Sequence, residues 1–155
     1  MDKIASFQMN HLKLLPGIYL SRRDQNGNSE ATTFDLRFTA PNREPVMDMS
    51  AIHTIEHLGA TFLRNSARKD EIVYFGPMGC RTGFYLVVFG SQQPEDIFPL
   101  IVEMCDFILA FEGEIPGARP EECGNWLEQN LAMAKYYIRR YRQELTEHRR
   151  LVYSV

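Results

Sequence analysis

Residues 32–38 read Thr32-Thr33-Phe34-Asp35-Leu36-Arg37-Phe38. Apolar and polar residues alternate along this stretch, which is the period of a strand with one buried face. Arg37 therefore falls on the polar face of the strand. The turn signal Asn26-Gly27-Asn28 lies upstream, so we expect residues 17–21 and 32–38 to pair as antiparallel strands through a longer loop.

Two further strands are expected downstream. Residues 72–75 and 82–89 are rich in the aromatic and β-branched side chains that strands favour. They flank the loop Gly76-Pro77-Met78-Gly79, which delivers Cys80 to the start of the second of these strands.

Three helices are expected as well. Residues 48–65 carry apolar residues at helical spacing, with Asp48 or Ser50 as the N-cap. Residues 94–111 form a second amphipathic pattern, and a third helix is expected to begin at Pro120 and to run toward Tyr141. This order predicts an α+β fold with a mainly antiparallel sheet and helices packed on one face. No linker or repeat divides the chain, so residues 1–155 are expected to form a single domain.

Composition narrows the class of protein. The 155 residues are 45% hydrophobic and 24% charged, as in ordinary globular proteins. A net charge of −3 argues against nucleic acid as a partner. The start lacks the apolar core of a signal peptide and no stretch reaches the length of a membrane span, so we expect a cytoplasmic protein without a membrane partner. The three cysteines are then expected to be reduced thiols.

The segment His53-Thr54-Ile55-Glu56-His57 suggests a metal site. Two histidines four residues apart on a helix lie about 40° apart around its axis, so both imidazoles can reach one ion. Glu56 projects beside them, where a carboxylate can act as general acid or base. A chance match is the competing interpretation, but three polar residues crowding an apolar helix need partners, and a metal supplies one.

Two alternative functions share this motif. The order His-x-x-Glu-His also occurs in inverted-motif metallopeptidases, in which Glu56 would activate water. A regulatory or scaffolding protein with a structural metal is the second alternative, and it would need four protein ligands.

The cysteines differ in their settings. Cys123 is the candidate third ligand, because it follows Pro120 in the first turn of the expected third helix, where the dipole favours a thiolate. Cys80 stands between Gly79 and Arg81, where it can be nucleophile, acid/base or ligand. Cys105 lies in an apolar helical segment and is expected to be packed in the core.

Several motifs occur in the order of one known family. They are Ser6-Phe7, His11, the Phe34-Asp35-Leu36-Arg37-Phe38 strand with Pro41-Asn42, the segment His53 to Leu58, the run Gly76 to Tyr85 and Glu122-Cys123-Gly124. With these motifs the chain resembles the S-ribosylhomocysteine lyase (LuxS) family over nearly its whole length.

The resemblance implies a homodimer of α+β subunits with active sites at the interface. It implies Fe(II), which zinc or cobalt can replace, on His53, His57 and Cys123, with water as the fourth ligand. Glu56 and Cys80 fall on the acid/base pair. Arg37 and, from the partner subunit, Ser6 and His11 fall on the ribose contacts, although each of these alone reads as an ordinary surface or turn residue.

The implied reaction cleaves the thioether of S-ribosylhomocysteine to homocysteine and 4,5-dihydroxy-2,3-pentanedione, the precursor of autoinducer-2. One departure concerns the amino-acid end of the substrate. Tyr74-Phe75-Gly76 stands where many relatives have an acidic residue followed by Ile-Ser.

Overall fold

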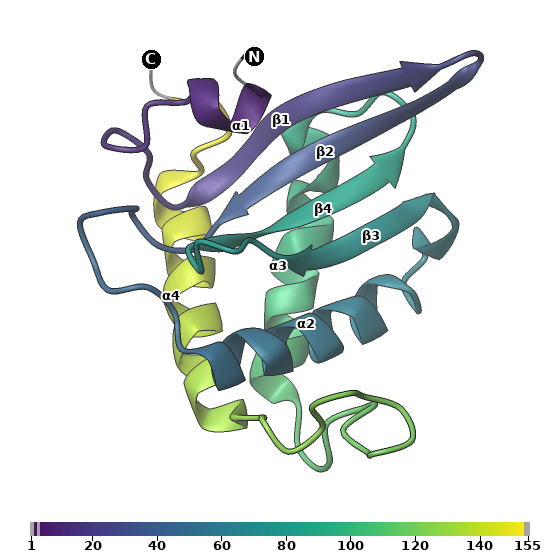
Figure 1. Ribbon diagram of the computed structural model, residues 1–155, viewed down its shortest axis with the longest axis vertical. Coiled ribbons are helices and arrows are strands. Elements are labelled where there is room, and N and C mark those ends of the chain that lie inside the picture. Colours follow the sequence, from purple (N-terminus) through teal and green to yellow (C-terminus); the bar gives the residue numbers. More distant parts are fainter. Residues whose placement is uncertain (1, 3, 154–155) are drawn as a thin grey trace.

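Four antiparallel strands form one sheet in the computed structural model, which describes residue 2 and residues 4–153, without the side chains of residues 5 and 6. The strands are β1 (Gly17–Asn26), β2 (Ser29–Arg37), β3 (Ile72–Pro77) and β4 (Gly83–Phe89), in the spatial order β1-β2-β4-β3 (Figure 1). The predicted strands are confirmed. The predicted longer loop between the first two is wrong, because β1 continues to Asn26 and meets β2 through a tight turn with Gly27 at φ +60°.

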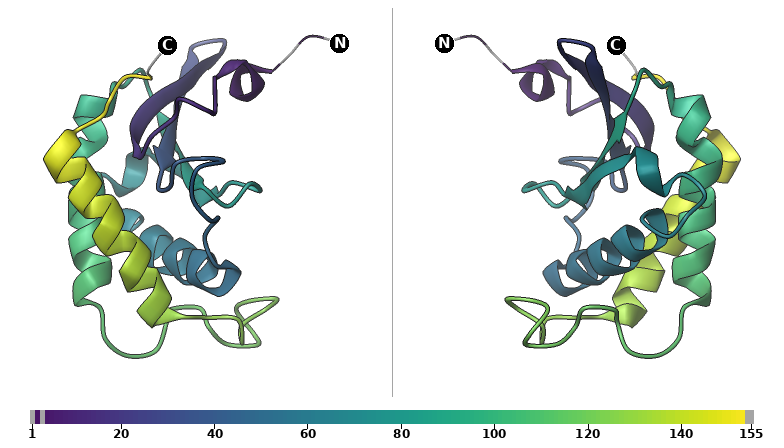
Figure 2. Two further views of the ribbon diagram at one scale, coloured as in Figure 1. Left: turned by 90° about the vertical axis from the view of Figure 1, so that its left-hand side faces the viewer. Right: turned by 90° about the vertical axis from the view of Figure 1, so that its right-hand side faces the viewer.

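Three long helices cover one face of this sheet. They are α2 (Met49–Leu63), α3 (Pro94–Ala110) and α4 (Leu131–His148), and Figure 2 shows them as a layer on one side. The short helix α1 (Ala5–Gln8) lies on the other side, and a turn of 3-10 helix, η1 (Lys69–Glu71), precedes β3. The α+β class with helices on one face is therefore confirmed. None of the described helices is long and apolar enough to cross a membrane.

The core lies between the helices and the sheet. Phe34 and Leu36 of β2 and Phe84 and Leu86 of β4 are fully buried on the face that the helices cover. Leu58 of α2 packs into the same cluster. The alternation along β2 thus directs every second side chain into the core, as predicted.

The helix that carries the histidines begins where the sequence predicts. The carboxylate of Asp48 accepts a hydrogen bond from Ala51 N at 3.1 Å, which satisfies one of the free amides of the first turn of α2. The buried face of α2 includes Ile52, Ile55 and Leu58, which recur at helical spacing. This packing fixes the direction in which the polar side of α2 points.

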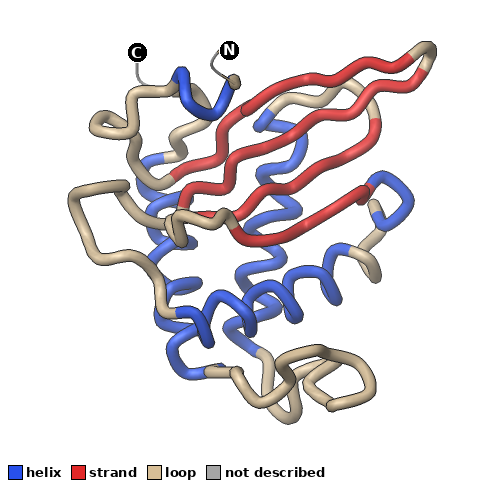
Figure 3. The backbone as a smooth tube through the Cα atoms, in the orientation of Figure 1, coloured by secondary structure: helices blue, strands red, loops and turns tan. Residues whose placement is uncertain are grey.

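The predicted start of the third helix is wrong. Residues 111–130 form a loop, drawn in tan between α3 and α4 in Figure 3, and α4 begins only at Leu131. Asn130 caps α4 by accepting a hydrogen bond from Met133 N at 3.0 Å. Cys123 therefore lies in the loop, and the helix dipole that we invoked for its ionisation is absent.

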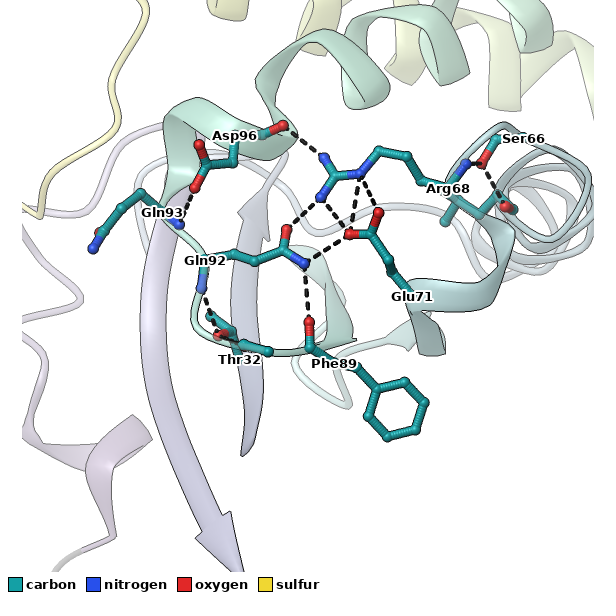
Figure 4. A network of polar contacts seen from close by, with 10 residues as sticks. Thr32, Ser66, Arg68, Glu71, Phe89, Gln92, Gln93 and Asp96 are labelled. Carbon is teal, nitrogen blue, oxygen red and sulfur yellow. Dashed lines mark hydrogen bonds and ion pairs between the residues drawn. The ribbon is translucent and has the colours of Figure 1, made fainter. Parts of the chain in front are cut away.

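A polar network fastens the segment before β3 to the start of α3 (Figure 4). Arg68 donates to Glu71 at 2.6 Å and to the backbone oxygen of Asp96 at 2.7 Å. The amide of Gln92 donates to the same Glu71 carboxylate at 2.8 Å. These contacts hold the segment that follows α2 and the β4–α3 connection together.

Candidate metal centre

The three predicted metal ligands converge. His53 and His57 lie one turn apart on α2, and their Nε2 atoms are 2.9 Å apart. Cys123 reaches them from the loop of residues 111–130, with its Sγ 3.4 Å from His53 Nε2. All three donor atoms lie within 4.8 Å of one another, and the three residues are half-buried.

Backbone carbonyls determine which imidazole nitrogens are free. His57 Nδ1 lies 2.7 Å from Pro116 O, and His53 Nδ1 lies 2.9 Å from Glu128 O. A carbonyl oxygen only accepts hydrogen bonds, so each Nδ1 carries the proton and each Nε2 presents a lone pair. The Gln129 amide, 3.3 Å from His53 Nδ1, fits this tautomer when its oxygen faces the ring.

This arrangement fits a cation. Two unprotonated Nε2 atoms at 2.9 Å would repel each other, and the sulfur of Cys123 adds a third electron donor. A metal ion relieves the repulsion, and the carbonyl contacts to Nδ1 are the outer contacts that metal-bound histidines usually make. Within the described residues this is the one group of three or more side chains that could hold a metal ion. An ion held by these three residues alone would keep a coordination position for substrate or water.

A second polar cluster surrounds Cys80 on the opposite face of the sheet from the helices. Cys80 is exposed in the turn between β3 and β4, and its Sγ lies 3.2 Å from Thr82 Oγ1. Arg37 Nη1 donates to the same hydroxyl at 2.5 Å and lies 3.9 Å from the sulfur. The structure therefore brings the predicted residues Arg37 and Cys80 together, although Arg37 comes from β2, more than forty residues away.

Arg37 is buried rather than solvated, and this corrects the expectation for the polar face of its strand. Its Nε and Nη2 atoms donate to both oxygens of Asp35, at 3.1 and 2.6 Å. Tyr153 covers this pair from the C-terminal segment, donating to Asp35 Oδ2 at 3.1 Å and stacking on Tyr19. Burial raises the pKa of Asp35, and the neighbouring guanidinium and the Tyr153 hydroxyl oppose that rise.

Within the described residues, no hydrogen bond or ion pair joins the remaining predicted residues to these clusters. Glu56 is half-buried on α2, and its side chain makes no hydrogen bond or ion pair within the described part of the chain. His11 Nδ1 donates to Met9 O at 2.9 Å, and the imidazole is near enough to Asp35 for its charge to oppose the rise in the pKa of that carboxyl. The side chain of Ser6 lies outside the described residues. No hydrogen bond or ion pair connects the described residues around Cys80 with the His53 cluster.

The side chain of Tyr74, the first residue of the departure noted in the sequence, lies along its own strand toward Gly76. A Cβ atom added at Gly76 would lie 1.9 Å from the Tyr74 hydroxyl, so glycine at 76 makes room for the ring. Tyr74 and Tyr85 line a pocket on the open face of the sheet together with Ile4. Tyr74 and Gly76 therefore depend on each other, because the tyrosine ring occupies the space that a side chain at position 76 would need.

Sequence reasoning missed the groups that support the site. The carbonyls of Pro116 and Glu128 cannot be identified from their residue types, because any residue offers a carbonyl. Asp35 and Thr82 each lie two residues from a predicted site residue, Arg37 and Cys80 respectively. Their polar side chains in otherwise apolar segments were the signal that could have identified them.

Comparison with known proteins gives a consistent result. The family model described as S-Ribosylhomocysteinase (LuxS) matches residues 4–151. The chain is 60% identical over 141 residues to the S-ribosylhomocysteine lyase of Finegoldia magna, covering 91% of this chain and 90% of the relative. It is 56% identical over 142 residues to the enzyme of that name from Clostridium acetobutylicum, covering 91% and 90%. It is 51% identical over 148 residues to the S-ribosylhomocysteine lyase of Porphyromonas gingivalis, and the match covers 95% of this chain and 93% of the relative.

Proposed function

The chain belongs to the S-ribosylhomocysteinase (LuxS) family and is an S-ribosylhomocysteine lyase, and from this premise we propose how its residues perform the reaction. The products of this carbon-sulfur lyase are homocysteine and 4,5-dihydroxy-2,3-pentanedione. The metallopeptidase alternative has no support, because neither the matched family nor the relatives named above are peptidases.

The observation that carries the metal-dependent mechanism is the convergence of two unprotonated imidazole nitrogens and one thiol. We assign His53, His57 and Cys123 as the ligands of one ion, Fe(II), which Zn(II) or Co(II) can replace, because all three metals accept nitrogen and sulfur ligands. When bound, the ion acts as a Lewis acid that stabilises negative charge on the sugar oxygens. The whole chain, residues 1–155, forms one metal-dependent lyase domain.

The acid/base chemistry falls to Glu56 and Cys80. The thioether sulfur is attached to the terminal sugar carbon, and the proton on the adjacent carbon becomes acidic only after the carbonyl has moved along the chain. Each migration removes a proton from one carbon and returns it to its neighbour, which Glu56 and Cys80 perform from two sides of the sugar. Removal of the now acidic proton then expels homocysteine as a thiolate, which takes up a proton.

Arg37 prepares Cys80 for this task and contacts the ribose. Its Nη1 lies 3.9 Å from the Cys80 sulfur, within hydrogen-bonding reach, and so helps to fix the position of that side chain. Asp35 holds two of the three guanidinium nitrogens, so the third is directed toward Cys80 and Thr82.

A homodimer completes the site in this proposal. The sheet face opposite the long helices bears a pocket lined by Ile4, Tyr74, Tyr85 and Val87 together with three polar residues, and Phe7 of α1, on the same side, is 70% exposed. An open apolar face of this kind suits a second subunit. The same N-terminal region carries Ser6 and His11, which we assign to the ribose of the partner subunit's site.

We further infer a cytoplasmic location and a place in the activated methyl cycle. Cys80, Cys105 and Cys123 are free thiols, as a reducing compartment maintains them, and two of them have roles that require a thiol. The pentanedione product is the precursor of autoinducer-2, so release of that signal in quorum sensing is the associated prediction.

Glu56→Gln and Cys80→Ala test the acid/base assignment at equal metal content. Both variants are expected to bind metal like the wild type and to lose release of homocysteine from S-ribosylhomocysteine, followed with a thiol-reactive dye. Glu103→Gln, at an exposed site on α3, is the matched control and should keep full activity. Full activity in metal-loaded Glu56→Gln or Cys80→Ala would remove that residue from the mechanism.

A further inference from the structure

We propose that Gly117 is a positioning residue for the metal centre, because its backbone conformation aims the Pro116 carbonyl at His57. The inference rests on the proposed metal site of His53, His57 and Cys123. It concerns a residue that lies beside the ligand His57 and takes no part in coordination.

The segment from Ile115 to Ala118 forms a tight turn. Ala118 N donates to Ile115 O at 3.1 Å, which closes a four-residue turn, and Pro116 and Gly117 occupy its two central positions. Gly117 has φ +73°. Proline at the second position and a positive φ at the third are the marks of a type II turn.

The type of turn decides where the Pro116 carbonyl points. Types I and II differ by a rotation of about half a turn of the central peptide, which is the peptide between Pro116 and Gly117. In the observed turn, this carbonyl lies 2.7 Å from His57 Nδ1. A residue that avoids positive φ favours type I, in which the carbonyl turns away and His57 loses its acceptor.

A side chain at position 117 would also press on the ligand itself. A Cβ atom built on Gly117 lies 3.1 Å from His57 Nδ1 and 3.3 Å from its Cε1 atom, closer than ordinary van der Waals contact. The two effects act in the same direction, since one removes the acceptor of the Nδ1 proton and the other displaces the ring.

The consequence for metal binding follows from the tautomer. With the proton held on Nδ1 by Pro116 O, His57 Nε2 is free to bind an ion. Without that acceptor the proton can move to Nε2, and the ion must displace it. Outer contacts of metal-bound histidines typically change metal affinity by about 10- to 100-fold, and we expect an effect in this range.

Gly113 offers a matched control in the same loop. It has φ +107°, so a side chain there suffers backbone strain as well, but nothing lies within 4 Å of a Cβ atom built on it. Gly113→Ala therefore reproduces the strain at position 117 without the contact to His57.

The experiment compares wild type, Gly117→Ala and Gly113→Ala in zinc affinity, by competition with a chelator. The tautomer of His57 is read in the metal-free proteins by nitrogen-15 NMR. We expect zinc affinity to fall about 10- to 100-fold in Gly117→Ala only, with the Nδ1-protonated tautomer of His57 replaced by a mixture. Equal affinities and equal tautomers in the two variants would overturn the inference.

Two further results separate this inference from the proposed function. If wild type binds no zinc, the proposed metal site fails, and the NMR comparison of metal-free proteins still decides the role of Gly117. If Gly117→Ala does not fold, Gly117→Asn replaces it, since asparagine tolerates a positive φ and retains only the steric contact. A loss of zinc affinity that is smaller than the range of about 10- to 100-fold expected for Gly117→Ala, but larger than the loss in Gly113→Asn, supports the inference. Equal zinc affinities in Gly117→Asn and Gly113→Asn refute it.

Discussion

Removal of the Asp35 carboxylate is expected to destabilise the fold severely. The side chains of Asp35 and Arg37 are only 4% and 3% exposed, and they meet at 2.6 Å. In Asp35→Ala the buried guanidinium keeps its charge and loses two of its hydrogen bonds, while Tyr153 loses its acceptor. Breaking a buried pair by removing one partner costs about 3–5 kcal/mol, a large part of the roughly 5–15 kcal/mol that stabilises a domain.

Asp24→Ala is the matched control. Arg22 and Asp24 are also two residues apart on one strand and meet at 2.8 Å, but their side chains are 60% and 54% exposed. Water solvates both partners of such a pair, so its loss costs about 0–1 kcal/mol.

Urea unfolding followed by circular dichroism measures both effects at equal protein concentration and metal content. With a slope near 2 kcal/mol/M, the midpoint should fall by about 1.5–2.5 M in Asp35→Ala and by less than about 0.5 M in Asp24→Ala. Equal shifts in the two variants would refute the reasoning, because they would show that burial does not distinguish the pairs.

Three further predictions concern single residues. Arg68 lowers the pKa of Glu71 below its ordinary 4.5, so this carboxylate stabilises the fold above that pH, and the contribution is lost as the pH falls through the lower folded pKa. Glu71→Gln should therefore lower stability by up to about 1 kcal/mol at pH 7, with the difference vanishing in acid-unfolding titrations. Burial raises the pKa of Cys105 to about 12, so brief alkylation at pH 8 and peptide mapping should find the exposed Cys80 modified and Cys105 untouched; equal labelling would contradict this. Arg81 has φ +58°, so Arg81→Gly should stabilise the fold by up to about 1 kcal/mol in urea unfolding, and a loss of stability would show that no strain is relieved.

The parts of the fold that local pattern determines were predicted from the sequence. The helix bearing His53 and His57 has an apolar face at helical spacing and a cap at Asp48, and both signals lie within one segment. The strand from residue 32 was predicted for the same reason. The apolar residues of this strand pair with apolar residues of β4, as where Phe34 opposes Leu86, so both strands present their apolar side chains to the same face.

The parts that depend on distant contacts were not predictable in this way. Residues 120–130 contain apolar residues compatible with a helix, yet this segment provides a carbonyl to His53 and the thiol of Cys123, and those contacts join positions about seventy residues apart. The burial of Arg37 depends likewise on Tyr153, which meets its partner Asp35 across 118 positions. Alternation identifies the face of a strand, but it does not show what covers that face.

In the proposed mechanism, catalysis depends on one ion held by His53, His57 and Cys123. The most direct measurement titrates Fe(II) into metal-depleted protein without oxygen and follows thiol release from S-ribosylhomocysteine, in wild type and in Cys123→Ala. Activity of the wild type should rise with added metal and saturate near about one ion per chain, while Cys123→Ala stays inactive at that ratio. Full thiol release by the metal-depleted wild type, or by Cys123→Ala at the same ratio, would contradict the claim.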